Sequence, residues 1–392
     1  MRKIAVITRY FPSSGEPAQG RSLYETLRVV GRSAGVRVFY PNATYPAVLR
    51  PRSRTYDRLD LDFRPPDVDV GYFNYPALPL ISRPLNGWTA ARILLPHVRA
   101  YAPDLVFGCF LYPEGFAALK IGRALGIPIV VMSIGTDLNG IGGFLAAKHV
   151  RAVVRQADYV VTVCDDLRKK AVAMGAAAAK TRTILNGCDL EIFCPRDRSE
   201  ARKKLGIDPL GKTVVYVGRM DLKKGLRELV DAAAALHPER PGLHCYLVGR
   251  GPDRSAIEEA IQAREASSYV HLVPGCAFNE VAVWMAAADL VTLPSYMEGC
   301  PNVVIEALAC GRPVVATNVG GTVELVSHDC GQLVPPHDSR FLSQALASVL
   351  DRPWDPAKIS MHLNRSWSAP AAELLEVFEA LLANGQEDIR VR

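Results

Sequence analysis

The sequence of 392 residues contains no apolar run long enough to form a membrane-spanning helix. Such a helix needs about 20 consecutive apolar residues. The N-terminal segment MRKIAVITRYFP is also unlike a signal peptide, because its apolar stretch IAVI is short and Thr8 and Arg9 follow at once. We therefore expect a cytoplasmic protein whose first segment is a buried strand.

The nine cysteines are scattered along the chain and include no CxxC pair. This pattern predicts neither a disulfide framework nor a zinc site. Most of these cysteines are expected to serve as small apolar core residues, and a reducing compartment is the simpler interpretation.

Positive charge is concentrated in one half of the sequence. Residues 1–190 hold 25 Lys and Arg against 14 Asp and Glu, a balance of +11, whereas the remainder holds 21 against 26, a balance of −5. A basic half indicates an anionic partner, although each cluster could also be a plain solvated surface. No nucleic-acid module is recognisable, so nucleic acid is not the expected partner. The clusters are Arg50, Arg52, Arg54 and Arg58, and then Lys148, Arg151 and Arg155.

Short apolar runs alternate with amphipathic runs of helical period, which predicts βαβ units and parallel sheets. In the first half, residues 41–87 show no clean period and are predicted to be long loops. The predicted strands there are Lys3–Thr8, Val36–Tyr40, Asp104–Gly108, Ile127–Ser133, Tyr159–Val163 and Arg182–Leu185. The predicted helices lie near 20–34, 88–101, 114–125, 143–156 and 165–174.

The second half repeats the pattern after a polar linker with a short helix at 193–212. We predict an α/β protein of two facing, doubly wound, Rossmann-like domains, 1–192 and 193–370, with ligands bound between the carboxyl ends of their strands. An amphipathic helix within 371–392 follows. The predicted strands are Thr213–Val217, His244–Val248, Tyr269–Val273, Leu290–Leu293, Pro313–Ala316 and Gln332–Val334. The predicted helices lie near 224–236, 253–265, 279–286, 302–310 and 339–350.

The segment GRMDLKKG at 218–225 places two cations after a predicted strand. Gly218 permits a tight exit from the strand, and Arg219 and Lys224 follow it. Arg offers a planar fork and Lys a point charge, a combination that suits a diphosphate. A surface loop with chance cations is the alternative.

The segment PSYMEGCPNVVIEALACGRPVVA at 294–316 carries two glutamates in an otherwise apolar stretch. Glu298 is predicted to lie on a loop, and Glu306 about one turn into a helix whose free N–H groups could bind an anion. We interpret the two carboxylates as acceptors for sugar hydroxyls. Other ligand contacts are predicted from the loop and first turn, namely Gly299, Cys300, Pro301, Asn302 and Val303, with Pro301 in the first turn.

Together with GGTVE at 320–324 and LNGCDLEIFCP at 185–195, these motifs resemble the retaining glycosyltransferases of family 4, which have the GT-B fold. The resemblance implies that Arg219 and Lys224 hold the donor diphosphate, that Glu298 lies by the donor sugar and that Glu306 contacts the nucleotide ribose. It also implies catalysis without a metal or other cofactor, and a last helix that crosses back to the first domain.

In the first domain the resemblance covers the start and the segment SIGTDLNG at 133–140. It implies donor contacts from Gly20, Gly135 and Asp137. The sequence departs from the family's pattern at Ile134, where many relatives carry a histidine near the reacting sugar. The retaining front-face mechanism suggested for the family lets the leaving phosphate take the acceptor proton, so transfer does not require that histidine.

The expected activity is transfer of a sugar from a nucleotide-sugar, a UDP-sugar by preference, to a hydroxyl of a glycan or lipid-linked acceptor in cell-surface polysaccharide or glycolipid synthesis. The basic first domain suggests peripheral attachment to the anionic inner face of a membrane. Two alternatives stay open: a non-catalytic donor-binding subunit and a GT-B sugar-nucleotide epimerase.

Overall fold

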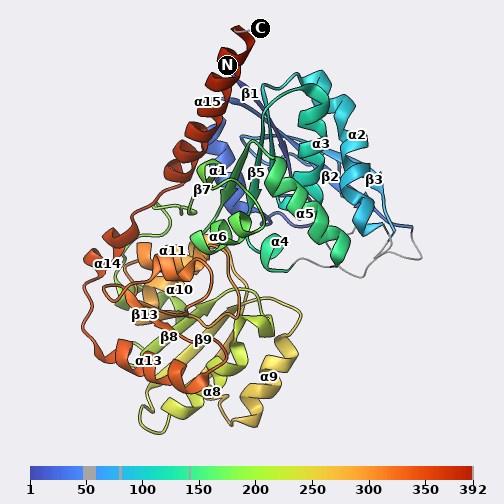
Figure 1. The fold of residues 1–392 in the computed structure, drawn as a ribbon. Coiled ribbons are helices and arrows are strands. Elements are labelled where there is room, and N and C mark those ends of the chain that lie inside the picture. The colour runs from blue at the N-terminus through green and yellow to red at the C-terminus, as the bar shows by residue number, and fades with distance from the viewer. Residues whose placement is uncertain (47–58, 79–81, 141–142, 391–392) are drawn as a thin grey trace. The chain divides into compact units, whose positions relative to one another are not determined.

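The computed structural model describes residues 1–390 apart from 47–58, 79–81 and 141–142. The Arg50–Arg58 cluster therefore lies outside the described residues. The chain divides into a first unit, residues 1–186 with 367–392, and a second unit, residues 187–366. Figure 1 shows the elements of each unit. No helix of the described chain is long and apolar enough to cross a membrane.

The first unit is built on a parallel sheet of seven strands in the order β3-β2-β1-β4-β5-β6-β7. Its strands are β1 (Lys3–Ile7), β2 (Gly35–Thr44), β3 (Asp69–Pro76), β4 (Leu105–Cys109), β5 (Ile129–Ser133), β6 (Tyr159–Thr162) and β7 (Thr181–Thr183). Its helices are α1 (Arg21–Val30), α2 (Asn86–Tyr101), α3 (Phe116–Leu125), α4 (Thr136–Asn139), α5 (Phe144–Gln156), α6 (Asp165–Ala173) and α15 (Ser368–Arg390), with the short turns η3 (Arg83–Leu85), η4 (Leu111–Gly115) and η5 (Ala178–Lys180).

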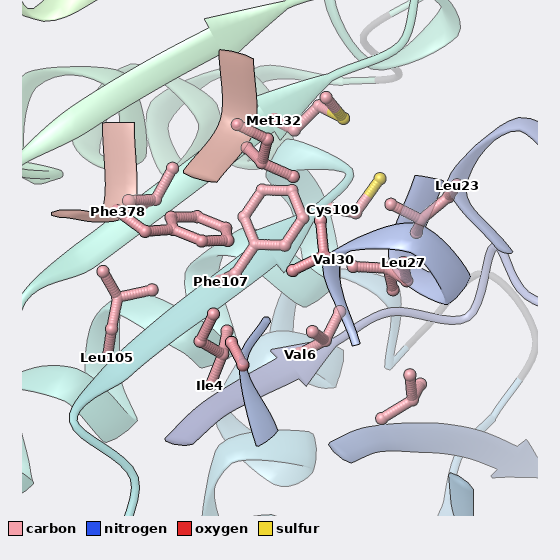
Figure 2. Packing of buried hydrophobic residues seen from close by; sticks show 14 of the residues in the cluster. Ile4, Val6, Leu23, Leu27, Val30, Leu105, Phe107, Cys109, Met132 and Phe378 are labelled. Atoms are coloured by element: carbon pink, nitrogen blue, oxygen red, sulfur yellow. The ribbon is translucent and has the colours of Figure 1, made fainter. Parts of the chain in front are cut away.

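The two faces of this sheet bury separate cores, because successive side chains of a strand point to opposite faces. Ile4 and Val6 of β1 join a cluster with α1 and α15, part of which Figure 2 shows. In this cluster the ring centroids of Phe107 and Phe378 are 5.5 Å apart. Ala5 and Ile7 join the second cluster with α2 and α3. Both faces of the sheet are thus covered by helices, as in doubly wound folds.

The second unit is built on a parallel sheet of six strands in the order β10-β9-β8-β11-β12-β13. Its strands are β8 (Lys212–Val217), β9 (Leu243–Gly249), β10 (Val270–Pro274), β11 (Leu290–Leu293), β12 (Val314–Thr317) and β13 (Gly331–Val334). Its helices are α7 (Arg198–Leu205), α8 (Leu226–Leu236), α9 (Arg254–Ala263), α10 (Phe278–Ala287), α11 (Asn302–Ala309), α12 (Thr322–Leu325), α13 (Ser339–Asp351) and α14 (Pro356–Leu363), with the turn η6 (Leu222–Lys224).

The strand order reverses once in each sheet, between β1 and β4 in the first unit and between β8 and β11 in the second. In open parallel sheets, ligands bind beyond the carboxyl ends of the strands at such a switch point. A ligand-binding site is therefore expected at the loops that follow these four strands.

The prediction that residues 41–87 are long loops is wrong in part. Strand β2 continues to Thr44, and β3 pairs with it in parallel register from Asp69 to Pro76. Only Val70, Tyr72 and Tyr75 of β3 are buried. Because other residues interrupt them, the strand is not a continuous apolar run.

Candidate functional site

In the second unit, loops at the switch point are held together by backbone-to-backbone contact. Gly225 adopts a left-handed φ of 68°, and a Cβ atom there would lie 2.0 Å from the carbonyl oxygen of Pro294. Gly320, with φ of 51°, would place a Cβ atom 2.0 Å from the carbonyl oxygen of Glu298. The β8 and β12 loops can therefore approach the β11 loop this closely only because glycine occupies both positions.

Hydrogen bonds fix the same loops in place. The N–H of Gly218 donates to the carbonyl of Val248 at 3.0 Å, and the N–H of Gly321 donates to the carbonyl of Gly299 at 2.7 Å. Of the sequence-predicted residues, Gly218 thus ties the turn after β8 to strand β9, and Gly299 ties the loop after β11 to the loop after β12. Their backbone positions support the charged side chains that lie beside them.

Lys224 and Glu298 form an ion pair, with Lys224 Nζ 2.7 Å from Glu298 Oε1. The lysine ends the turn η6 after β8, and the glutamate lies in the loop after β11. Their side chains are 29% and 11% exposed, so the pair is shielded from water more than a surface pair would be. Sequence reasoning placed both residues at the site but missed this pairing, because 74 positions separate them.

Arg219 is the more accessible of the two cations. Its side chain is 68% exposed, and its Nε atom lies 4.0 Å from Asp221 Oδ2. Its backbone carbonyl accepts a hydrogen bond from the hydroxyl of Tyr216 at 2.8 Å, which fixes the turn after β8. The guanidinium is therefore presented to solvent from a fixed backbone.

Glu306 is buried in α11, with 8% of the residue exposed. Its charge acts on the thiol of Cys188: burial raises the pKa of this thiol to about 12, and the Glu306 and Asp189 carboxylates add to the rise. Glu306 therefore lies close to the segment around Cys188, in the LNGCDLEIFCP motif.

The start of α11 differs slightly from the prediction. Pro301 lies one residue before the helix, as its N-cap, with φ of −75° and ψ of 109°. Asn302 and Val303, both half-buried, form the first helical positions, whereas Cys300 is buried. Pro301 still lacks an N–H that the helix would leave unbonded, so the physical reason for its position is unchanged.

Tyr296 is a residue of this region that sequence reasoning did not select. Its hydroxyl donates to Glu228 Oε1 at 2.7 Å, and its ring centroid lies 3.7 Å from that of His337. It precedes Glu298 by two positions and connects the β11 loop to α8. Its position two residues before Glu298, in the segment PSYMEG, is the sequence feature that could have identified it.

In the first unit, Gly20 and Gly135 take backbone conformations that disfavour other residues. Gly20 is the N-cap of α1 with φ of 65°, and a Cβ atom there would lie 2.2 Å from the carbonyl oxygen of Tyr10. Gly135 precedes α4 with φ of 135°. The close contact at Gly20 fixes the loop after β1 against the start of α1.

Asp137 is buried and organises the loops after β4 and β5. Its Oδ1 accepts hydrogen bonds from the Ser133 hydroxyl at 2.8 Å and the Gly135 N–H at 3.0 Å, and its Oδ2 accepts one from the Leu111 N–H at 2.9 Å. The carboxylate is therefore engaged within the unit. Ile134, between these partners, is half-buried and packs against the core on the α1 and α15 side.

A cavity of about 290 Å³ opens at the switch point of the first unit. Its walls come from the loops after β1 and β4 and from the segment before α1. Three of the lining side chains are aromatic, and the others include one cation, one carboxyl group and one amide. The lining residues are Arg9, Tyr10, Gln19, Phe110, Tyr112, Pro113 and Glu114.

Glu114 is the chemically distinctive residue of this cavity, and sequence reasoning missed it. It is 5% exposed. Burial raises the pKa of its carboxyl to about 7, although hydrogen bonds from backbone N–H groups and the charge of Arg9 oppose the rise. Gln19 Oε1 is buried and has no hydrogen-bond partner among the residues that the structure describes. Nothing in the segment LYPEG distinguishes this glutamate from others in the sequence.

No group of three or more His, Cys, Asp or Glu in the described residues is arranged to hold a metal ion. At the switch point of the second unit, Arg219 and Lys224 carry positive charge on the turn after β8.

Comparison with known proteins places these features in a family. Residues 21–187 match the family model "Glycosyl transferase 4-like domain", and residues 211–352 match "Glycosyl transferases group 1". A Bacillus subtilis protein, named glycosyltransferase TuaC and assigned by that name to teichuronic acid biosynthesis, is 30% identical over 88% of each chain.

Solved structures share the fold. Sucrose-phosphate synthase from Thermosynechococcus elongatus has a TM-score of 0.80 at 23% identity, covering 98% of this chain and 100% of that one. Anabaena Alr3699/HepE in complex with UDP-glucose has a TM-score of 0.73 at 19% identity, covering 97% and 100%. By its sequence relatives, this chain belongs to the group 1 glycosyl transferases, the family-4 glycosyltransferases of GT-B fold.

Proposed function

We propose that this glycosyltransferase moves a sugar from a UDP-sugar to a hydroxyl group, with retention of anomeric configuration. The observation that carries the proposal is the set of charges at the switch point of the second unit. Arg219, Lys224 and Glu298 lie there on loops whose close approach depends on glycine, and Glu306 lies in the helix α11 that follows. A nucleotide diphosphate needs the cations, and hydroxyl-rich sugars need the carboxylates.

In this proposal Lys224 exchanges partners when the donor binds. Its ammonium group is held by Glu298 in the structure, and the diphosphate takes the place of that carboxylate. Glu298 is then available to accept hydrogen bonds from hydroxyls of the transferred sugar. Arg219, already exposed, needs no such release. The UDP-glucose complex of Alr3699/HepE, a structural neighbour, supports a uridine nucleotide as donor.

We propose that catalysis needs no resident metal or other cofactor. Arg219 and Lys224 supply positive charge where the leaving diphosphate develops negative charge, and such preorganised groups stabilise transition states strongly. Ile134 cannot transfer a proton. The acceptor hydroxyl therefore passes its proton to the leaving phosphate oxygen, on the face of the sugar from which the phosphate departs.

The cavity beside Glu114 is the proposed acceptor site. At about 290 Å³ it is at the small end of ligand pockets, which suits one sugar ring better than a long chain. Aromatic walls can pack on the ring, while Glu114 and Gln19 can bond its hydroxyls. The assignment of TuaC to teichuronic acid biosynthesis supports an acceptor in cell-surface polysaccharide or glycolipid synthesis, made at the cytoplasmic side of the membrane.

Purified protein incubated with UDP-, GDP- and ADP-sugars tests the proposal, with and without a lipid-linked or free glycan acceptor. We expect UDP release to depend on the acceptor and the product to keep the donor's anomeric configuration by NMR. Efficient turnover of the donor alone would instead favour the epimerase. Donor binding without turnover on any acceptor would favour the non-catalytic subunit. Ile134 is the residue that motivates this alternative, because many relatives carry a histidine there.

A thermal-shift screen over the free nucleotides UDP, GDP and ADP complements the assay, because it does not require the right acceptor. A ligand at about 100 times its dissociation constant stabilises the folded state by about 2.7 kcal/mol. The largest shift is expected with UDP. Equal shifts with all three would contradict the choice of base while leaving the transfer reaction intact.

A further inference from the structure

Two helical layers cover the first unit's sheet, and they differ in charge. Helices α2 and α3 pack on one side, with α5 against α3, whereas α1 and α15 lie on the other side (Figure 1). The sequences of α2, α3 and α5 contain no Asp or Glu at all. Those of α1, α6 and α15 all contain carboxylates.

The carboxylate-free helices carry cations along their whole length. Apart from Lys120, which is half-buried, these cations are exposed. None of them takes part in an ion pair with any described residue, in contrast to the cations of α1 and α6, which pair with carboxylates on their own helices. The cations are Arg92 and Arg99 on α2, Lys120 and Arg123 on α3, and Lys148, Arg151 and Arg155 on α5.

Large apolar side chains are exposed at one end of this cationic face. Leu85 is 60% exposed and Trp88 is 50% exposed, at η3 and the start of α2. Phe144 is 84% exposed and Leu145 is 50% exposed, at the start of α5. Helix α5 packs against η3, so these starting turns lie on the same part of the unit.

Cations and apolar side chains meet directly here. The ammonium of Lys120 lies 4.0 Å from the centre of the Trp88 ring, and Trp88 packs on Phe116 at 5.4 Å. His149, whose ring lies 4.6 Å from that of Phe116, has its pKa lowered by burial and by the charges of Lys148 and Lys120. The lysines of α3 and α5 therefore approach one another at the apolar end, with no carboxylate between them on these helices.

We propose that α2, α3 and α5, with η3, form a docking face for an anionic lipid bilayer. Its cations would lie at the headgroups, and Trp88, Phe144 and Leu145 would enter the interface. Clustered Lys and Arg are attracted to anionic leaflets, and aromatic side chains favour the membrane–water boundary. An acidic protein is the alternative partner, because exposed apolar residues also occur at protein interfaces, and absence of binding to anionic vesicles would favour it.

The proposed partner is therefore a membrane surface. This inference rests on the proposed function, since a lipid-linked acceptor would be presented at that surface. The face also adjoins the proposed acceptor cavity. Tyr112, which lines the cavity, stacks on His149 at 5.0 Å, and its hydroxyl donates to the carbonyl of Arg83 in η3 at 2.7 Å. An acceptor headgroup reaching the cavity would thus pass the docked end of the unit.

Vesicle co-sedimentation tests the proposal without any substrate, so its outcome is independent of whether transfer occurs. The vesicles contain phosphatidylglycerol and phosphatidylcholine in equal parts, or phosphatidylcholine alone. Salt is set to about 0.1 M or about 1 M, where the Debye length falls from about 10 Å to about 3 Å. We expect binding to the anionic vesicles at low salt and its loss at high salt or on phosphatidylcholine.

Matched variants locate the face. K148E/R151E should lower the partition coefficient on anionic vesicles by at least ~30-fold, since two cations are replaced. K203E/K204E, which reverses two exposed lysines of α7 in the second unit, should change it little beyond the effect of net charge. The variant F144S/L145S should also weaken binding, whereas L210S, at a position 92% exposed, should not.

Thermal melting confirms that each variant is folded, and all four positions on α5 are at the surface. Absence of wild-type binding to anionic vesicles would overturn the proposal. So would equal losses in K148E/R151E and K203E/K204E, because attraction would then depend on net charge and not on this face. Binding of the wild type that F144S/L145S leaves unchanged would remove the apolar part of the docking face.

Discussion

The switch points of the two sheets are built in the same place but with opposite chemistry. In the second unit, the loop after β8 carries the exposed Arg219 and the partly buried Lys224, and Glu298 of the loop after β11 pairs with the lysine. In the first unit, the loops after β1 and β4 surround a small cavity with a buried Glu114 whose pKa is raised. The loops of the second unit thus expose the charge of Arg219, whereas those of the first unit bury the carboxyl of Glu114.

This difference follows from what each unit is proposed to bind. The diphosphate is the same in every nucleoside-diphosphate sugar, so fixed cations on glycine-supported loops suffice to hold it. Acceptors differ in shape and in the pattern of their hydroxyls, so their recognition requires a cavity made of several larger side chains. The comparison predicts that substitutions in the second unit change reaction rate most, whereas those in the first change acceptor choice and pH response.

The largest effect is expected from removing the cations of the second unit. Arg219→Ala or Lys224→Ala should lower the transfer rate by ~100- to 1,000-fold, because each removes charge that stabilises the leaving diphosphate. Steady-state assays with UDP-sugar measure this. The neighbouring exposed Lys223→Ala is the matched control and should keep near-normal activity.

The two cation variants should differ in stability. Arg219 is 68% exposed, so its removal should leave the melting temperature unchanged. Lys224→Ala leaves the largely buried carboxylate of Glu298 without its partner, which should lower the melting temperature. Near-normal rates in both variants would sink the assignment of these residues to the diphosphate.

Glu114→Gln should remove a pH dependence that belongs to the first unit. The folded pKa of Glu114 is about 7 against an ordinary 4.5, so the folded state binds the proton more tightly. The free energy of unfolding of the wild type should therefore fall as pH rises from about 4.5 to about 7. The whole change from this group is roughly 3 kcal/mol.

Urea unfolding at a series of pH values measures that dependence. It should flatten in Glu114→Gln and persist in Asp62→Asn, which alters an exposed carboxylate of the same unit. If the cavity binds the acceptor, Glu114→Gln should also raise the acceptor KM while the donor KM stays constant. Identical pH profiles in wild type and Glu114→Gln would refute the raised pKa.

The smallest effects are expected from the two glutamates of the second unit, and they should differ. Glu306→Gln should weaken binding of free UDP by about tenfold, the loss expected for a hydrogen bond to a charged group. Glu298→Gln should leave free UDP binding intact or tighten it, because Lys224 is released, and it should lower turnover. Isothermal titration separates the two, and identical behaviour would show that the division of roles is wrong.

The sequence predicted most strands of both sheets because parallel strands covered on both faces are nearly continuous apolar runs. It missed β3 at a sheet edge, where fewer than half of the strand's residues are buried. At the site, Arg219, Lys224, Glu298 and Glu306 could be selected because they lie in segments with glycines and a distinctive order. Whether they contact the donor stays a prediction.

Other features of the site depend on tertiary structure and leave little local trace. The Lys224–Glu298 pair joins two strands' loops far apart in sequence, and no spacing rule reports such a contact. Glu114 is set apart from any other glutamate only by its burial, which depends on the packing of loops from β1 and β4. The carboxylate-free helices were visible in the sequence only as a charge excess over the first half and as the cluster Lys148, Arg151 and Arg155.

The ion pair between Lys224 and Glu298 also bears on how the site empties. After transfer, the nucleoside diphosphate holds more negative charge than it did as part of the donor, and two fixed cations alone would retain it. Glu298, already beside the lysine at 2.7 Å in the structure, can reclaim that partner as the diphosphate leaves. If the proposed function holds, the carboxylate would thereby limit product inhibition, and Glu298→Gln should show a slower off-rate for UDP.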